Sequence, residues 1–245
     1  MDEARRFLRY IIPSAVFAVE IFIFLLILFP DWTLCKLSSI KEKEGLALVA
    51  ASIFASGGLG YLFSSIHHTI RWWWCPVINH KELILSLTAG NFLALRNQAD
   101  NTLIDQTTLK NLTLPDAWII ASTLWFNRLK TSEVIAGADS RTASLVDLSH
   151  SLGTLRISCV TAFMATLWIA SNIGWFDLHC EPVLRFSAFI FLFFVLLCIH
   201  QCSHKKTALF AEGIINETLA DVLIAERNRL GHPVETRVIL GRDKR

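Results

Sequence analysis

Apolar residues along this chain fall into four long blocks that are separated by polar and charged stretches. The blocks cover residues 10–29, 45–66, 157–176 and 186–202. Each block is close to the length of about 17–25 residues that an α-helix needs to cross the hydrocarbon core of a bilayer. The pattern therefore predicts an all-α, polytopic membrane protein with four transmembrane helices.

Amphipathic stretches outside these blocks predict helices beside the membrane. Apolar positions at helical spacing predict helices over residues 81–96, 116–130 and 140–152, the last continuing into the third span, and another over 207–230 that Gly231 and Pro233 end. The predicted parts are an N-terminal tail and hairpin (1–66), a helical cytosolic insertion (67–154), a second hairpin (155–203), and a cytosolic C-terminal helix with an extended arm (204–245).

Composition agrees with this class, since 53% of the residues are hydrophobic and only 18% are charged. With four spans, 19 of the 23 Lys and Arg residues fall on the side that holds both termini. Cytoplasmic segments carry the excess of Lys and Arg, so both termini are predicted to lie in the cytoplasm, with the spans in a bacterial inner membrane. A signal peptide over residues 1–30 is the rival interpretation, but no small-x-small cleavage site follows the apolar run, so we favour a span.

Glu20 is the one acidic residue inside a predicted span, and a carboxylate near the middle of a bilayer is costly. One interpretation places it in a ring lining a cation path or in a proton relay. The other is a protonated or hydrogen-bonded carboxyl group facing Ser or Thr of a neighbouring helix. No second intramembrane acid or base is apparent at its depth, which favours the second interpretation.

Small residues recur every fourth position in the second and third predicted spans. Such faces allow close helix packing in lipid, where small side chains let backbones approach and hydroxyl groups can bond across the interface. The two faces therefore predict that these spans pack together, within one chain or between copies. The predicted helix-packing residues are Ser52, Ser56, Gly60, Ser64, Ala162, Thr166, Ala170 and Gly174.

Two of the six cysteines, Cys35 and Cys180, lie alone in the two predicted outer loops. An oxidising compartment would allow a disulfide between them. Cys198 and Cys202 lie one helical turn apart, with His200 and His204 nearby, but buried cysteines in an apolar helix are commoner than a metal site. The sequence therefore predicts no metal and no cofactor.

A group of cationic and aromatic residues follows the second span, where tryptophan favours the membrane interface. The two adjacent histidines point in different directions on a helix, so we expect them to face lipid headgroups and not to share a metal. The predicted interface cluster is His67, His68, Arg71, Trp72, Trp73 and Trp74.

Catalytic signatures are scarce in this sequence. It has no phosphate-binding loop, HExxH, GxSxG or paired CxxC motif. Arg227 and His232 have the Arg-x4-His spacing of HEPN-type ribonucleases, but such spacing often arises by chance and Gly231 places His232 at a helix end. The sequence therefore predicts no enzyme, and the absence of a dense basic patch with interleaved aromatic residues argues against direct binding of nucleic acid.

In outline the whole layout resembles the small four-span membrane proteins of prokaryotic antiviral systems, particularly the membrane subunit of the Kiwa system. Two hairpins, a cytosolic insertion, a C-terminal helix and the lack of an enzyme signature carry the resemblance. It implies a sensor or effector that contacts membrane lipids, self-associates and works with a cytosolic protein partner. An oligomeric ion channel or small transporter with a housekeeping role is the alternative.

Overall fold

The computed structural model describes residues 7–40, 57–71, 80–173 and 181–238. The described chain is mostly helical and divides into two compact units. The first unit comprises Met1–Arg71 and Asp147–Lys206, and the second comprises Trp72–Val146 and Thr207–Arg245. Helices α8 (Glu133–Ile173) and α9 (Glu181–Leu230) contribute residues to both units.

Three helices are long and apolar enough to span a membrane, namely Arg9–Leu28, Glu133–Ile173 and Val183–Leu230. Each contains one of the predicted spans or most of it. Of the second predicted span, residues 45–56 lie outside the described residues, and the remainder belongs to a helix over residues 57–71. We call the first unit the membrane unit because the apolar parts of all these helices lie in it.

Two N-terminal helices follow the π-helical turn η1 (Phe7–Ile11) in the membrane unit. Helix α2 (Ile12–Leu28) carries Pro13 in its first turn, where a missing N–H is tolerated. The backbone leaves helical geometry at Phe29, because the ring of the following proline clashes with a helical conformation of the residue before it. Helix α3 (Pro30–Ser39) then begins. The predicted outer loop that contains Cys35 is therefore helical over α3. Proline is well suited to the first position of such a helix, and Thr33 Oγ1 donates to Leu25 O at 3.1 Å across the break.

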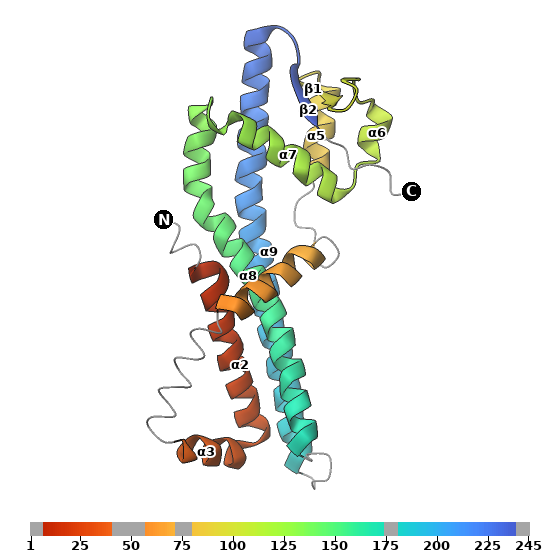
Figure 1. Cartoon of the computed structure of the whole chain (residues 1–245). Helices are drawn as coiled ribbons and strands as arrows, with labels where there is room; N and C mark the ends of the chain where they lie inside the picture. Colours follow the sequence, from red (N-terminus) through yellow and green to blue (C-terminus); the bar gives the residue numbers. More distant parts are fainter. Residues whose placement is uncertain (1–6, 41–56, 72–79, 174–180, 239–245) are drawn as a thin grey trace. The chain divides into compact units, whose positions relative to one another are not determined.

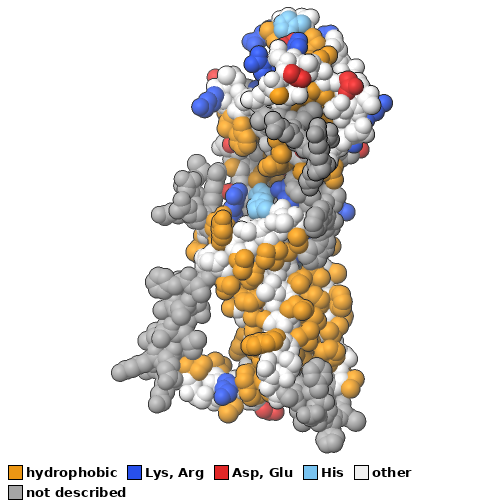
Figure 2. Space-filling model, turned by 45° about the vertical axis from the view of Figure 1, so that its right-hand side comes forward, with side chains coloured by type: hydrophobic (Ala, Val, Ile, Leu, Met, Phe, Trp, Pro, Cys, Tyr) orange, Lys and Arg blue, Asp and Glu red, His pale blue; other side chains and the backbone are white. Residues whose placement is uncertain are grey.

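The surface of the membrane unit is largely apolar (Figure 2), whereas part of its interior is polar. Large hydrophobic side chains that face outward include Val19, Tyr61, Met164, Trp168, Leu184 and Phe191. Polar or charged residues that are buried there include Glu20, Ser64, His67, Asp147, Thr154, Arg156, Ser158 and His204. This reversal of the usual soluble pattern is expected where lipid is the solvent.

The second unit contains a small α/β element that the sequence did not predict. Its members are α5 (His80–Ala89), β1 (Leu93–Asn97), α6 (Gln106–Lys110), α7 (Leu114–Leu129), the start of α8, the end of α9, and β2 (Val234–Val238). In Figure 1 the two strands lie beside α5. They pair in parallel, with Leu93 opposite Val234. One core cluster, including Ile84, Leu95, Ile120, Leu124, Leu219 and Val234, joins these elements.

The helix predicted over residues 81–96 was wrong beyond Ala89. Gly90 ends α5, and Asn91 adopts a φ of 58°, a left-handed conformation that no helix interior accepts. Between β1 and α7 lies the short helix α6, which Asp105 caps by accepting from the Thr108 N–H. The predicted continuity of the 140–152 helix with the third span is confirmed by α8, and the 207–230 helix is continuous with the fourth span in α9.

Candidate functional site

Helices α8 and α9 run antiparallel in the membrane unit (Figure 1). Polar side chains of the two helices form hydrogen bonds along their line of contact. Three levels are marked by Cys159 beside His200, Arg156 bonded to Gln201, and Ser149 bonded to His204. Ten residues of α8 separate the first level from the last, which corresponds to about 15 Å of helix. We call Glu20, His67, Arg156, Cys159, His200, Gln201 and His204 the polar seam.

Glu20 enters the seam from α2 and is 3% exposed. Its Oε1 lies 3.0 Å from His200 Nε2, and one ligand atom each of Glu20, Cys159 and His200 lies within 4.8 Å of the other two. The inference that no base lies at the depth of Glu20 was therefore wrong. His200 sits near the inner end of an apolar block in the sequence, and only the antiparallel packing of the helices brings it level with Glu20.

Arg156 is completely buried one turn from Cys159. It donates to Gln201 Oε1 at 2.5 Å, and its second terminal nitrogen lies 3.3 Å from His67 Nδ1. A guanidinium can only donate, so Nδ1 of His67 accepts and the imidazole is neutral. Burial, followed by the nearby His204 and Arg156, lowers the pKa of His67 to about 2, which agrees with this geometry.

Gly153 provides the space for the His67 ring. A Cβ atom at this position would lie 2.2 Å from Cε1 of the imidazole and 2.3 Å from its Nε2. His67 is 1% exposed, so the expectation that it faces lipid headgroups was wrong. The sequence contains a signal for this contact, since a glycine inside a long helix often marks close packing.

His204 lies at the end of the seam that contains the contact with Ser149, and we call this the inner end and the opposite end, beside Cys159, the outer end. Its Nδ1 donates to the backbone oxygen of Ser149 at 2.9 Å, and its ring centroid lies 5.3 Å from that of His67. His68 is only partly buried and lies 4.8 Å from the His150 ring. Its partial burial, together with Arg71 and Arg9, lowers the pKa of His68. Arg9 forms an ion pair with the buried Asp147. The inner end is thus rich in cationic and neutral nitrogen groups.

The other end of the seam is closed by aromatic rings. Phe24 lies one turn beyond Glu20 on α2, and Phe163 lies one turn beyond Cys159 on α8. Phe163 stacks on Phe189 and Phe193 of α9, with centroids 4.9 and 4.1 Å apart, and Phe24 meets Phe189 edge to face at 5.1 Å. Polar groups therefore give way to a packed aromatic cluster within one helical turn of Glu20.

Three described residues of the predicted small-residue faces have neighbours other than the facing span. Gly60 lies against η1, since a Cβ atom there would be 1.8 Å from the backbone oxygen of Tyr10. Ala162 and Ala170 belong to the cluster that includes Phe24 of α2 and the phenylalanines of α9. Buried Thr166 donates to Ala162 O within its own helix, and Ser64 is also buried. The remaining residues predicted for these faces, Ser52, Ser56 and Gly174, lie outside the described residues.

Other predicted site residues are dispersed. Cys198 and Cys202 are exposed, whereas His200 and His204 turn into the seam. Cys35 is exposed on α3, and Cys180 lies outside the described residues, as do Trp72, Trp73 and Trp74. The Cys35–Cys180 disulfide stays a prediction, and labelling of both thiols in membranes under non-reducing conditions would contradict it.

Arg227 and His232 have separate surroundings in the second unit. The Arg227 guanidinium carbon lies 5.8 Å from the centre of the Phe92 ring, which places the cation over an aromatic face. His232 is exposed, and its Nδ1 donates to the backbone oxygen of Pro233 at 3.0 Å. The two side chains therefore have different contacts in the described part of the chain.

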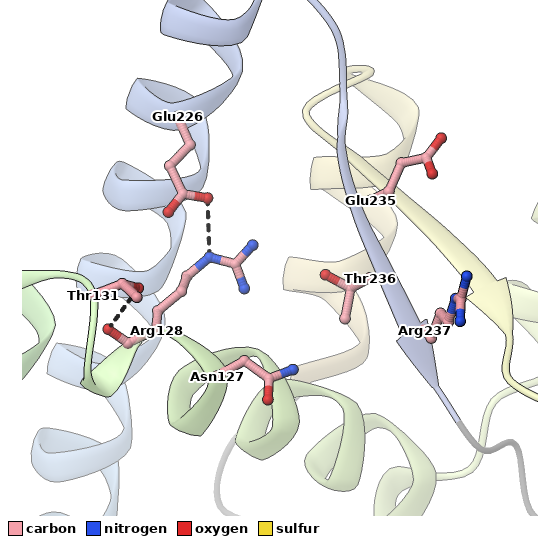
Figure 3. A pocket seen from close by; sticks show the side chains of 7 residues that line it. All are labelled: Asn127, Arg128, Thr131, Glu226, Glu235, Thr236 and Arg237. Carbon is pink, nitrogen blue, oxygen red and sulfur yellow. Dashed lines mark hydrogen bonds and ion pairs between the residues drawn. The ribbon is translucent and has the colours of Figure 1, made fainter.

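A polar pocket of about 370 Å³ lies in the second unit between α7, α9 and β2 (Figure 3). The Arg128 Nε donates to Glu226 Oε2 at 3.0 Å, and the Thr236 side chain extends from β2 toward Arg128. Glu235 accepts two hydrogen bonds from Arg96, which lower the pKa of its carboxyl group. The lining residues are Asn127, Arg128, Thr131, Glu226, Glu235, Thr236 and Arg237. Because most of these charges are already paired, the polar seam is the stronger candidate site.

Comparison with known proteins gives no relative for this chain. No family model, no curated protein and no solved structure matches it.

Proposed function

We propose that the protein is a membrane-embedded sensor and effector, in which the polar seam sets the state of α8 and α9 and the second unit passes that state to a soluble partner. The observation that carries the proposal is the fully buried Arg156, bonded to Gln201 and His67 inside an apolar-surfaced bundle. Ionisable groups are expensive within a membrane protein and mark function by default. The packing of the described helices is compatible with four spans.

Chain continuity supports a link between the two units. Seam residues Arg156 and Cys159 lie on α8, and Gln201 and His204 lie on α9. The same helices supply Ile135, Ala138, Leu219 and Leu223 to the core of the second unit. A change in the seam that moves either helix therefore acts on residues that hold the second unit together.

Hydrogen exchange can test this coupling. Glu20→Gln preserves the shape of the side chain but alters the Glu20–His200 contact, so we expect exchange at β1 and β2 to change by about fivefold or more, the range of typical couplings between sites. Exchange would be measured by mass spectrometry on the full-length protein in nanodiscs. Cys198→Ala is the matched control, because this exposed residue lies on α9 only two positions from His200. Changes restricted to the membrane unit would contradict the proposal.

The alternative of an oligomeric channel makes a different prediction. A ring of Glu20 side chains would have to line a shared path, yet Glu20 is buried within its own chain and faces His200. The aromatic cluster of Phe24, Phe163 and Phe189 also closes the seam beyond it. We therefore favour a sensor, and depolarisation of cells on expression of this protein alone would favour the channel.

Self-association and antiviral defence belong to the same proposal. Apolar surface on the membrane unit is available to other copies as well as to lipid, and symmetric assembly is the common outcome. Mass photometry in detergent that finds only monomers would contradict self-association.

The setting in antiviral defence in a bacterial inner membrane is proposed on the resemblance in layout. Phage challenge of cells carrying the gene with and without its neighbouring gene tests that setting.

A further inference from the structure

The outer end of the polar seam brings together the donor atoms of three elements. Glu20 comes from α2, Cys159 from α8 and His200 from α9, and their ligand atoms lie within 4.8 Å of one another. Glu20 and Cys159 are 3% and 0% exposed, and the Cys159 thiol interacts with the Glu20 carboxyl group. Among the described residues, this is the one group of three such side chains that meets that spacing.

An unsatisfied carboxylate oxygen points to a ligand at this place. Oε1 of Glu20 faces His200, but its Oε2 is buried without a hydrogen-bond partner in the described part of the chain. A buried polar atom left unpaired costs about 1–3 kcal/mol, and more where it is charged. A cation bound between the three side chains would satisfy this oxygen.

We propose that Glu20, Cys159 and His200 bind a divalent metal ion of the zinc class. Zinc takes carboxylate oxygen, thiolate sulfur and imidazole nitrogen together, whereas calcium and magnesium require oxygen ligands. The carboxylate and the thiolate carry two negative charges, which balance the two positive charges of the ion. The neutral sum suits a site enclosed by apolar helices, where net charge is costly.

The spacing of the donors suits a tetrahedral ion after a small adjustment. Bonds of about 2.0–2.3 Å place neighbouring ligand atoms of such an ion roughly 3.5 Å apart. The Glu20–His200 distance of 3.0 Å would therefore open slightly, and the wider contacts would close. Three protein ligands leave a fourth position for water or another side chain, and binding releases the proton of the Cys159 thiol to solvent.

The histidines at the inner end of the seam do not compete for this ion. His67 Nδ1 accepts from Arg156, and Gly153 lies against the other edge of its ring. His204 Nδ1 donates to Ser149 O, and the buried guanidinium of Arg156 repels a cation there. The acidic and thiol ligands are found only at the outer level, beside His200, within the described seam.

This assignment rests on the proposed function, because it names the ligand of the same seam. Metal binding can nevertheless be measured whether or not the seam affects the second unit. The test uses the purified full-length protein in nanodiscs with Co²⁺ as a spectroscopic probe and Zn²⁺ as a competitor. We expect one Co²⁺ per chain, a thiolate-to-cobalt charge-transfer band, and release of protons to a pH indicator. Zinc should abolish the band.

Variants identify the ligands. Cys159→Ala should remove the charge-transfer band, and Glu20→Gln and His200→Asn should each weaken binding by at least about tenfold. Cys202→Ala, a matched control at an exposed cysteine of α9, should bind as the wild type does. The wild-type spectrum reports a sulfur ligand without any substitution, so a variant that fails to fold does not decide the result.

Two outcomes would overturn the metal site. The first is a wild-type protein without cobalt binding or without a thiolate band, and the second is a band that persists in Cys159→Ala. Metal binding that leaves exchange at β1 and β2 unchanged would keep the site and contradict the sensor. If hydrogen exchange at β1 and β2 responds to Glu20→Gln in a protein that binds no metal, the sensor is supported and the metal site is contradicted.

Discussion

A Gly60→Ala protein is expected to unfold about 2–12 °C below the wild-type protein. The added Cβ atom would lie 1.8 Å from the Tyr10 backbone oxygen and 2.5 Å from its carbonyl carbon, which no rotation of a side chain can relieve. Overpacking of this kind typically costs about 1–3 kcal/mol and sometimes more, and one kcal/mol shifts the midpoint by about 2–4 °C in a chain of this size. Thermal unfolding in nanodiscs, followed by tryptophan fluorescence, measures the shift.

Gly58→Ala is the matched control for Gly60. Gly58 lies two residues away in the same helix, and a Cβ atom there would meet nothing within 4 Å. Alanine in place of a helical glycine stabilises by about 0.5–1 kcal/mol, so this variant should unfold at the wild-type temperature or slightly above. Equal midpoints for the two variants would show that the contact between Gly60 and Tyr10 does not hold η1 in place.

The sequence predicts the membrane helices well because their signal is local. An uninterrupted apolar block of sufficient length is enough to place a helix, and the blocks that contain Glu20, Cys159 and His200 all lie in long helices of the structure. The stop at Gly231 is equally local, since its φ of 76° suits the residue after a helix.

The polar seam could not be derived in the same way, because its members are far apart in the chain. Glu20 and His200 are separated by 180 positions, and Arg156 and His67 by 89. Whether His200 faces lipid or Glu20 depends on the rotation of α9 against α2, which the apolar pattern of a lipid-exposed helix does not determine. Cys198 lies two residues before His200 on α9 and therefore points to a different side of the helix, where it is exposed.

The strand pair was missed because its two members look helical or irregular by themselves. Leu93 and Leu95 continue the apolar spacing of α5, and only the left-handed Asn91 after Gly90 separates them from it. Their pairing partners, Val234 and Thr236, lie in a segment too short and too polar to predict as a strand. Parallel pairing between distant segments leaves no signature within either segment.

Gly153→Ala should destabilise the protein as long as His67 is present. The new Cβ atom would lie 2.2 Å from the imidazole, which is 1% exposed and has no room to withdraw. Displacing the ring also removes the acceptor that Arg156 uses, and a buried donor left without its partner costs about 1–3 kcal/mol. We therefore expect a fall of several degrees in the unfolding midpoint. Gly213→Ala, in open surroundings on α9, should raise it slightly.

Removing the imidazole should reverse the sign of the effect. In a His67→Ala background the space beside Gly153 is empty, so Gly153→Ala should be neutral or stabilising by about 0.5–1 kcal/mol, as for any helical glycine without a close neighbour. The four proteins of this double-mutant cycle give the interaction between the two positions directly. The same loss in both backgrounds would mean that Gly153 serves the helix itself. A reversed sign would show that this glycine is required by the histidine that accepts from Arg156, and so by the seam.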